Sequence, residues 1–165
     1  MKRRPGPDDP AKPKRSAYDK ALGLLARREH SRRELKTKLR QGGYEGEETS
    51  AAIDRLGEQQ YQDDDRFSEM LLRSRIAQGY GPMRLRVELK SHGLADARIR
   101  ELLEAVDIDW NVMAAAQLRR RYGAGTNDPA ERNKRAQFLL RRGFAAATVR
   151  NVTHADVDEA ADDVS

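Results

Sequence analysis

Residues 25–44 of this 165-residue chain, LARREHSRRELKTKLRQGGY, decide the fold. Ser31 stands three residues before Glu34, and this spacing is the capping box that begins a helix. Two leucines four residues apart then give the apolar stripe of one helix face. Gly43 closes the stretch, because glycine readily adopts the left-handed conformation that ends a helix. The stretch therefore predicts one capped, strongly basic helix.

The same pattern returns twice, because Gly43, Gly93 and Gly143 follow one another at intervals of fifty residues. The second copy keeps both leucines of the first. The third copy keeps one leucine and has Arg135 in place of the other. The aligned apolar residues are Leu35, Leu39 and Tyr44 in the first copy, Leu85, Leu89 and Leu94 in the second, and Leu139 and Phe144 in the third. Three copies at one period indicate a tandem repeat.

Each copy should contain three helices, because an apolar helical segment precedes the glycine-ended helix and a short apolar pair follows it. No stretch alternates as a strand does, and no Asn-Gly hairpin signal occurs. The sequence therefore predicts an all-α protein of three tandem three-helix repeats forming an elongated, curved array. The predicted repeats cover residues 16–61, 62–107 and 108–153. Residues 1–15, with four prolines, should form a disordered basic arm, and residues 154–165 an acidic tail.

Composition excludes several classes of protein. The chain has no cysteine, which excludes disulfides, thiolate zinc sites and cysteine nucleophiles. It has neither an apolar run long enough to span a membrane nor a signal peptide at its start, so we expect a cytoplasmic protein with no membrane partner. Residues 110–154 hold nine basic and two acidic residues. Such a positive field attracts polyanions, nucleic acid included, although a solvated basic face gives the same pattern.

The candidate binding residues are basic side chains on the outer face of the repeated helix. With the two leucines turned inward, a period of about 100° per residue gathers Arg33, Lys36 and Arg40 on the far side. Arg86 and Lys90 hold equivalent positions in the second repeat. The third repeat departs from the rule, and its charge lies on Arg132, Lys134, Arg135, Arg141 and Arg142. For any one of these residues, solubility and local ion pairing remain an alternative explanation.

No constellation of residues indicates catalysis. Asp63, Asp64 and Asp65 are consecutive and so point in different directions, which favours charge at a helix start over a metal site. There is no nucleophile elbow, P-loop or HExxH pattern. The histidines lie far apart in sequence and are typical of surface or capping positions: His30, His92 and His154. We therefore expect no enzyme, no cofactor and no metal, and packing roles for Trp110 and Tyr122.

Three blocks together resemble the RecX family, bacterial regulators of the RecA recombinase. They are ALGLLARREHSRRELKTKLRQGGY (21–44), YQDDDRFSEMLLRSRIAQGYGPMRLRVELKSHGL (61–94) and RAQFLLRRGF (135–144). The matching positions are Arg28, Ser31, Glu34 and Leu35, then Asp64, Arg66 and Phe67, then Phe138, Leu139, Arg142, Gly143 and Phe144. Two departures are Gly81, which stands where Ser31 caps the first repeat, and the longer loop RYGAGTNDP (121–129).

The resemblance implies a regulator that binds along the groove of the RecA–single-stranded DNA filament and has no catalytic centre. It implies limits on filament growth or stability, ATP hydrolysis, strand exchange and cleavage of the LexA repressor. We expect such a protein to be monomeric. The alternative is a helical-repeat protein that binds single- or double-stranded DNA directly, if only weakly, which an isoelectric point near 9.6 permits. Direct binding would need no RecA and would weaken steeply with salt.

Overall fold

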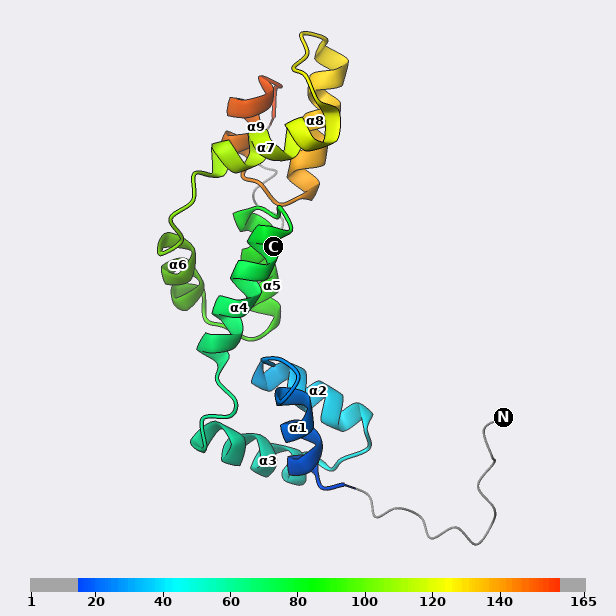
Figure 1. The fold of residues 1–165 in the computed structure, drawn as a ribbon, viewed down its shortest axis with the longest axis vertical. Helices are drawn as coiled ribbons and strands as arrows, with labels where there is room; N and C mark the ends of the chain where they lie inside the picture. Colours follow the sequence, from blue (N-terminus) through cyan, green and yellow to red (C-terminus); the bar gives the residue numbers. More distant parts are fainter. Residues whose placement is uncertain (1–14, 158–165) are drawn as a thin grey trace, which may run out of the picture. The chain divides into compact units, whose positions relative to one another are not determined.

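The computed structural model describes residues 15–157, and within that range it has nine helices and no strand (Figure 1). This confirms the prediction of an all-α fold of three tandem three-helix repeats. Most of the predicted basic arm (residues 1–14) and of the predicted acidic tail (residues 158–165) lies outside the described residues. The chain divides into two compact units, one up to Asp63 and one from Asp64 onward. None of the described helices has the length and apolar character needed to cross a membrane.

The first unit holds one repeat, made of α1 (Ala17–Leu25), α2 (Arg32–Gln41) and α3 (Gly46–Glu58). The Ser31 hydroxyl accepts a hydrogen bond from the Glu34 N–H at 3.0 Å, as the capping pattern predicts. The α1 helix packs closely along α3. The core between the three helices consists of Ala17, Ala21, Leu35, Leu39, Ala52, Ile53 and Leu56.

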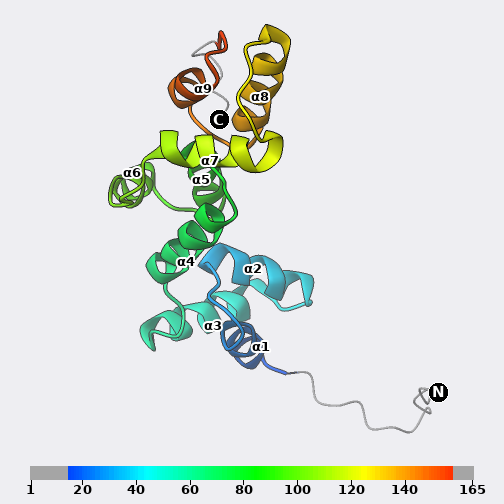
Figure 2. The same ribbon diagram turned by 45° about the horizontal axis from the view of Figure 1, so that its top comes forward.

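The second unit holds the other two repeats. The middle repeat has α4 (Asp64–Ala77), α5 (Pro82–Ser91) and α6 (Asp96–Glu104), and the last has α7 (Trp110–Tyr122), α8 (Pro129–Arg141) and α9 (Ala146–Thr153). Prolines occupy the start of α5 and α8, where no backbone donor is needed. Trp110 contacts the cores of both repeats, as expected of an inter-repeat residue. In Figure 2, α7 crosses the ends of α4 and α5.

A backbone joint connects the middle and last repeats. The Gly81 N–H donates to the Arg142 carbonyl at 2.8 Å, and the Met83 N–H donates to the Gly143 carbonyl at 2.9 Å. A Cβ at Gly81 would lie 2.4 Å from the Gly143 carbonyl oxygen, and a Cβ at Gly143 would lie 2.4 Å from Cβ of Arg84. Glycine therefore replaces the capping serine of the first repeat because another backbone occupies the space of a side chain.

The last repeat extends beyond residue 153, where the sequence analysis ended it. Ala155 and Val157 are buried in its core. The Arg150 guanidinium donates to the Val157 carbonyl at 2.8 Å and holds this extension against α9. The first residues of the predicted acidic tail are thus part of the folded repeat.

We predict that Gly81→Ala destabilises the second unit. The φ of Gly81 is −89°, which alanine adopts without strain, so the cost is steric and about 1–3 kcal/mol. Gly23→Ala is the matched control, because it has open space around it within α1 and should stabilise by about 0.5–1 kcal/mol. Urea unfolding followed by circular dichroism measures both. Equal urea midpoints for Gly81→Ala and wild type would show that the joint accommodates the added methyl group without loss of stability.

Candidate functional site

The predicted binding residues of the first repeat share one outer surface of α2. Arg33, Lys36 and Arg40 are all exposed. A groove of about 410 Å³ lies between α2 and α3, and Arg32, Arg33 and Lys36 form its basic side. Arg32 also forms an ion pair with Asp54 of α3. The surface therefore gathers several cations on one side of the helix, which suits an anionic partner.

A polar corner, in which His30 is buried and Arg28 is exposed, fixes the start of α2 and so the direction of this surface. Arg28 donates to both carboxylate oxygens of Glu34, at 3.1 and 2.5 Å. The His30 ring is buried, with Nδ1 3.0 Å from the Arg28 carbonyl oxygen and Nε2 3.8 Å from Glu34. The Gln62 amide donates to the His30 carbonyl at 3.3 Å. The expectation of a surface or capping histidine is therefore wrong for His30, which is a packing residue.

In this corner the pKa values of His30 and Glu34 are both lowered. Burial lowers the pKa of His30, and this effect outweighs the opposing influence of the Arg28 carbonyl and the Glu34 carboxylate. Burial alone would raise the pKa of Glu34, but the Arg28 hydrogen bonds, with the charges of Arg28 and Lys38, lower it overall. The folded protein therefore favours a neutral imidazole beside an ionised carboxylate.

In the middle repeat, Arg86 and Lys90 are exposed one turn apart on α5. Lys90 forms a well-exposed ion pair with Asp96, with 3.5 Å between Nζ and Oδ1. On another side of α5, Glu88 accepts two hydrogen bonds from Nε of Arg75, at 2.9 and 2.8 Å, which ties α5 to α4. The Arg75 guanidinium lowers the pKa of Glu88 accordingly. Arg75 thus has a structural role, whereas Arg86 and Lys90 face solvent.

The structure separates the five predicted residues of the last repeat into three groups. Arg132 donates to the Thr126 carbonyl at 3.3 Å and to the Asn127 side chain at 3.2 Å. Arg135 donates to the Ala124 carbonyl at 2.9 Å, and its side chain is only 12% exposed. These two residues therefore hold the long loop before α8. Lys134 and Arg141 are exposed, and Arg142 belongs to the joint described above, where it donates to the Gln78 carbonyl at 3.0 Å.

Arginines and aromatic rings alternate across the second unit, and we call this set the arginine–aromatic ladder. Guanidinium carbons lie 4.1 to 5.9 Å from ring centroids along the whole set. Its members in spatial order are Arg84, Tyr80, Arg142, Phe138, Arg121, Tyr122 and Arg135. Tyr122 and Phe138 also meet edge to face, with centroids 5.7 Å apart. Each contact is a cation–π interaction that orients a charged group beside an apolar ring.

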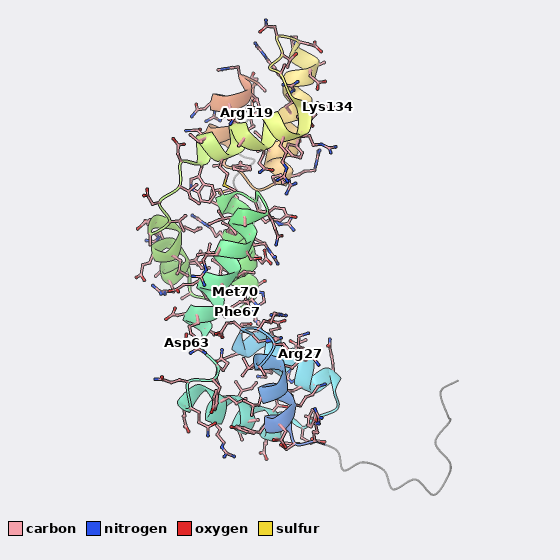
Figure 3. The ribbon with its side chains drawn as sticks, in the orientation of Figure 1. Arg27, Asp63, Phe67, Met70, Arg119 and Lys134 are labelled. Atoms are coloured by element: carbon pink, nitrogen blue, oxygen red, sulfur yellow. The ribbon has the colours of Figure 1, made fainter. Side chains whose placement is uncertain are left out.

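Sequence reasoning missed part of this basic region. Arg84 and Arg121 were absent from the predicted set, as were Arg119 and Arg120, which are exposed in the last turn of α7. Figure 3 shows Arg119 on α7 and Lys134 on α8. The run RRRY (119–122) was the available signal, because its arginines directly precede an aromatic residue. Within residues 15–157, no cluster of three or more histidine, aspartate and glutamate side chains is placed to hold a metal ion.

Comparison with known proteins gives a consistent result along the whole repeat region. Family models described as the first, second and third three-helix domains of RecX match residues 17–56, 63–103 and 112–153. "Regulatory protein RecX" of Stenotrophomonas maltophilia (strain K279a) is 44% identical over 159 residues, which cover 96% of this chain and 93% of the relative. "Regulatory protein RecX" of Halorhodospira halophila is 46% identical over 135 residues, which cover 80% of this chain and 83% of the relative.

Two solved structures share the fold. A crystal structure of RecX from Lactobacillus salivarius has a TM-score of 0.67 at 23% identity and covers 84% of this chain and 92% of its own. A second crystal structure of a regulatory protein RecX has a TM-score of 0.69 at 22% identity, covering 84% of this chain and 70% of its own. At this level of identity, the likeness concerns the fold alone.

We predict that acid destabilises the first unit through His30. Because its pKa in the fold lies below the ordinary value of 6.5, the neutral ring contributes stability above that pH, and this stability is lost as the pH falls. Glu34 adds a loss only at lower pH, below its ordinary value of 4.5. Urea unfolding at pH 7 and pH 5.5 should show a smaller loss for His30→Gln than for wild type. An unchanged loss would show that His30 is not the group responsible.

Proposed function

The chain belongs to the RecX family, and from this membership we propose that it regulates RecA by binding along the groove of the RecA–single-stranded DNA filament. The proposal rests above all on the three successive RecX domain models, which match residues 17–153 in order. Bound there, the protein would limit filament growth or stability, ATP hydrolysis, strand exchange and LexA cleavage. It would act as a ligand of the filament in the cytoplasm, as a monomer and without catalysis of its own.

The two matched basic helices support this proposal. A filament presents the same protein surface from one protomer to the next, and α2 and α5 present cations at equivalent positions of two successive repeats. Lys36 and Arg40 of α2 correspond to Arg86 and Lys90 of α5, and all four are exposed. Carboxylates of a protein partner and phosphates of bound DNA are both suitable acceptors for such side chains.

A second candidate function is direct binding of single-stranded nucleic acid, and the arginine–aromatic ladder is the observation that favours it. Stacking platforms combined with positive charge are the usual means of binding single strands without sequence preference. Arg84 and Arg121 are exposed, while the rings of Tyr80, Tyr122 and Phe138 are partly exposed. The ladder would place guanidinium groups near phosphates and leave ring and guanidinium faces for bases.

We predict that the five-site variant Arg33→Glu, Lys36→Glu, Arg40→Glu, Arg86→Glu and Lys90→Glu loses inhibition of RecA. Five reversed charges replace attraction by repulsion on both helices, so inhibition of RecA ATP hydrolysis on single-stranded DNA should need at least about tenfold more protein. All five side chains are exposed, so the helical content seen by circular dichroism should not change. The measurement starts with the wild-type protein titrated well below the RecA concentration.

The control for this experiment reverses exposed charges elsewhere. An α2 triple variant carries only Arg33→Glu, Lys36→Glu and Arg40→Glu. The control Lys20→Glu, Arg27→Glu, Arg100→Glu makes the same change of charge on other exposed surfaces. It should inhibit as the wild type does, whereas the α2 triple variant should be weaker. If the folded five-site variant inhibits like the wild type, these two helices are not the binding surface. If the wild type inhibits only when it is abundant enough to coat the DNA, competition for the strand is the better explanation.

We predict that the ladder governs any binding of single-stranded DNA in the absence of RecA. Arg84→Ala and Arg121→Ala should each weaken binding of a fluorescent oligo-dT by about 0.5–2 kcal/mol. They should also reduce the salt dependence by about one unit of slope for each phosphate that the variant no longer neutralises. Arg100→Ala, which changes an exposed arginine outside the ladder, is the control. If all three variants bind oligo-dT with the same affinity as the wild type, the ladder is not the DNA-binding site.

A further inference from the structure

An apolar groove of about 510 Å³ opens between α4 and α6 of the middle repeat. We call it the α4–α6 groove. Its α4 wall includes Leu72 and Ile76, and its other wall includes Leu102, Val106 and Ile108. Figure 1 shows α6 standing to one side of α4 and α5. The volume lies within the range of about 300–1,000 Å³ that is usual for sites that bind ligands.

The groove exists because the middle repeat is packed differently from the other two. The first and third helices of the outer repeats, α1 with α3 and α7 with α9, pack closely along each other, whereas α4 and α6 do not. Ala17 and Ala21 lie on the face of α1 that allows this approach, and both are fully buried. Fifty residues later, Phe67 and Leu71 occupy these positions. Their larger side chains fill the space beside α5 and keep α6 away from α4.

The exposed side of α4 has the pattern of a helix that packs against another helix. The residues lining the groove on α4 recur at positions i, i+3, i+4, i+7 and i+8: Glu69, Leu72, Arg73, Ile76 and Ala77. Such a stripe normally faces a neighbouring helix. Among the described residues of the second unit, this stripe faces α6 only across the groove.

Charge indicates what kind of helix fits. The segment that forms the second wall, ELLEAVDID (101–109), carries four acidic residues and no basic residue. On the α4 wall, Glu69 and Arg73 offset each other. None of these four acidic residues lines the groove itself. Glu101 pairs with Arg98 and Asp109 caps α7, so the groove is apolar and a segment of net negative charge lies beside it. An occupant with apolar residues on one face and lysine or arginine at its edge would match both features.

We propose that the α4–α6 groove binds an amphipathic, basic-edged helix of a partner protein. The mode is a helix laid into a hydrophobic groove, with anchors spaced three and four residues apart. The inference rests on the proposed function, under which the partner is a protomer of the RecA filament. It adds an apolar anchor to the basic surfaces of α2 and α5. The chain's own segment 1–15 fits the groove less well, because it is rich in proline and almost without apolar residues.

The first test introduces charge into the groove without removing core side chains. Ala77 and Ala105 line the groove and are exposed. In the variant Ala77→Lys, Ala105→Lys, the ammonium groups would meet both the apolar face and the basic edge of the occupant. We expect binding to preassembled RecA filaments to weaken at least about tenfold, with unchanged circular dichroism. The matched control is Ala97→Lys, which lies on α6 outside the groove and should bind as the wild type does.

The outcomes separate this inference from the proposed function. Wild-type affinity of the folded double variant would overturn the groove proposal and leave the RecA proposal standing. Failure of the wild-type protein to bind filaments would overturn both. Loss of binding in Ala97→Lys as well would show that added charge, and not the groove, causes the effect.

The second test identifies the occupant directly. A photo-crosslinking amino acid at position 105, with position 97 as the control, is irradiated in a mixture of purified RecA, single-stranded DNA and this protein. We expect a crosslink from position 105, but not from 97, to a RecA peptide that combines apolar residues at helical spacing with lysine or arginine. A crosslink to a second copy of this chain, or to its own residues 1–15, would overturn the proposal.

Discussion

The structure depends on one turn, which ends the second helix in all three repeats. The second helix of each repeat ends on a glycine with positive φ, at 80° for Gly43, 91° for Gly93 and 86° for Gly143. The next residue, which is apolar, donates its N–H back to a leucine carbonyl in the helix, at 3.2 to 3.4 Å. This backbone motif satisfies carbonyls that the helix end would leave unpaired and turns the chain toward the third helix. The leucine that accepts the bond also lies in the core, so helix end and core packing are fixed together.

Local signals explain why this part of the fold could be predicted. Caps, prolines and glycines act over a few residues, so Ser31 and Pro82 marked helix starts correctly in the sequence. The role of Gly81 could not be found in the same way. It depends on the Gly143 carbonyl, which is distant in sequence and reaches this position only when the two repeats pack. The absence of a capping side chain at Gly81 is therefore explained by a tertiary contact with Gly143, which the sequence does not reveal.

The candidate site was predictable only in part, for a similar reason. Helical periodicity placed Arg33, Lys36 and Arg40 on an outer face, because exposure on a single amphipathic helix follows from its own sequence. It could not distinguish exposed arginines in the last repeat from those that hold a loop. Arg132 donates to the Thr126 carbonyl and Arg135 to the Ala124 carbonyl, and the loop conformation that presents those carbonyls is not encoded in helix spacing. Charge alone does not reveal which arginines are already engaged.

That distinction bears on how a basic protein divides its cations between folding and binding. A guanidinium that bonds to its own backbone must give up those bonds before it can meet a new acceptor, and each such hydrogen bond contributes about 0.5–1.5 kcal/mol. An exposed pair such as Lys90 with Asp96 has little to lose, because surface ion pairs contribute about 0–1 kcal/mol. Lys90 can therefore exchange Asp96 for a partner's carboxylate or phosphate at small cost. Arg135, at 12% exposure, cannot leave its loop so readily. Binding energy should accordingly come from the outer faces of α2 and α5, while Arg132 and Arg135 of the last repeat mainly hold their own fold.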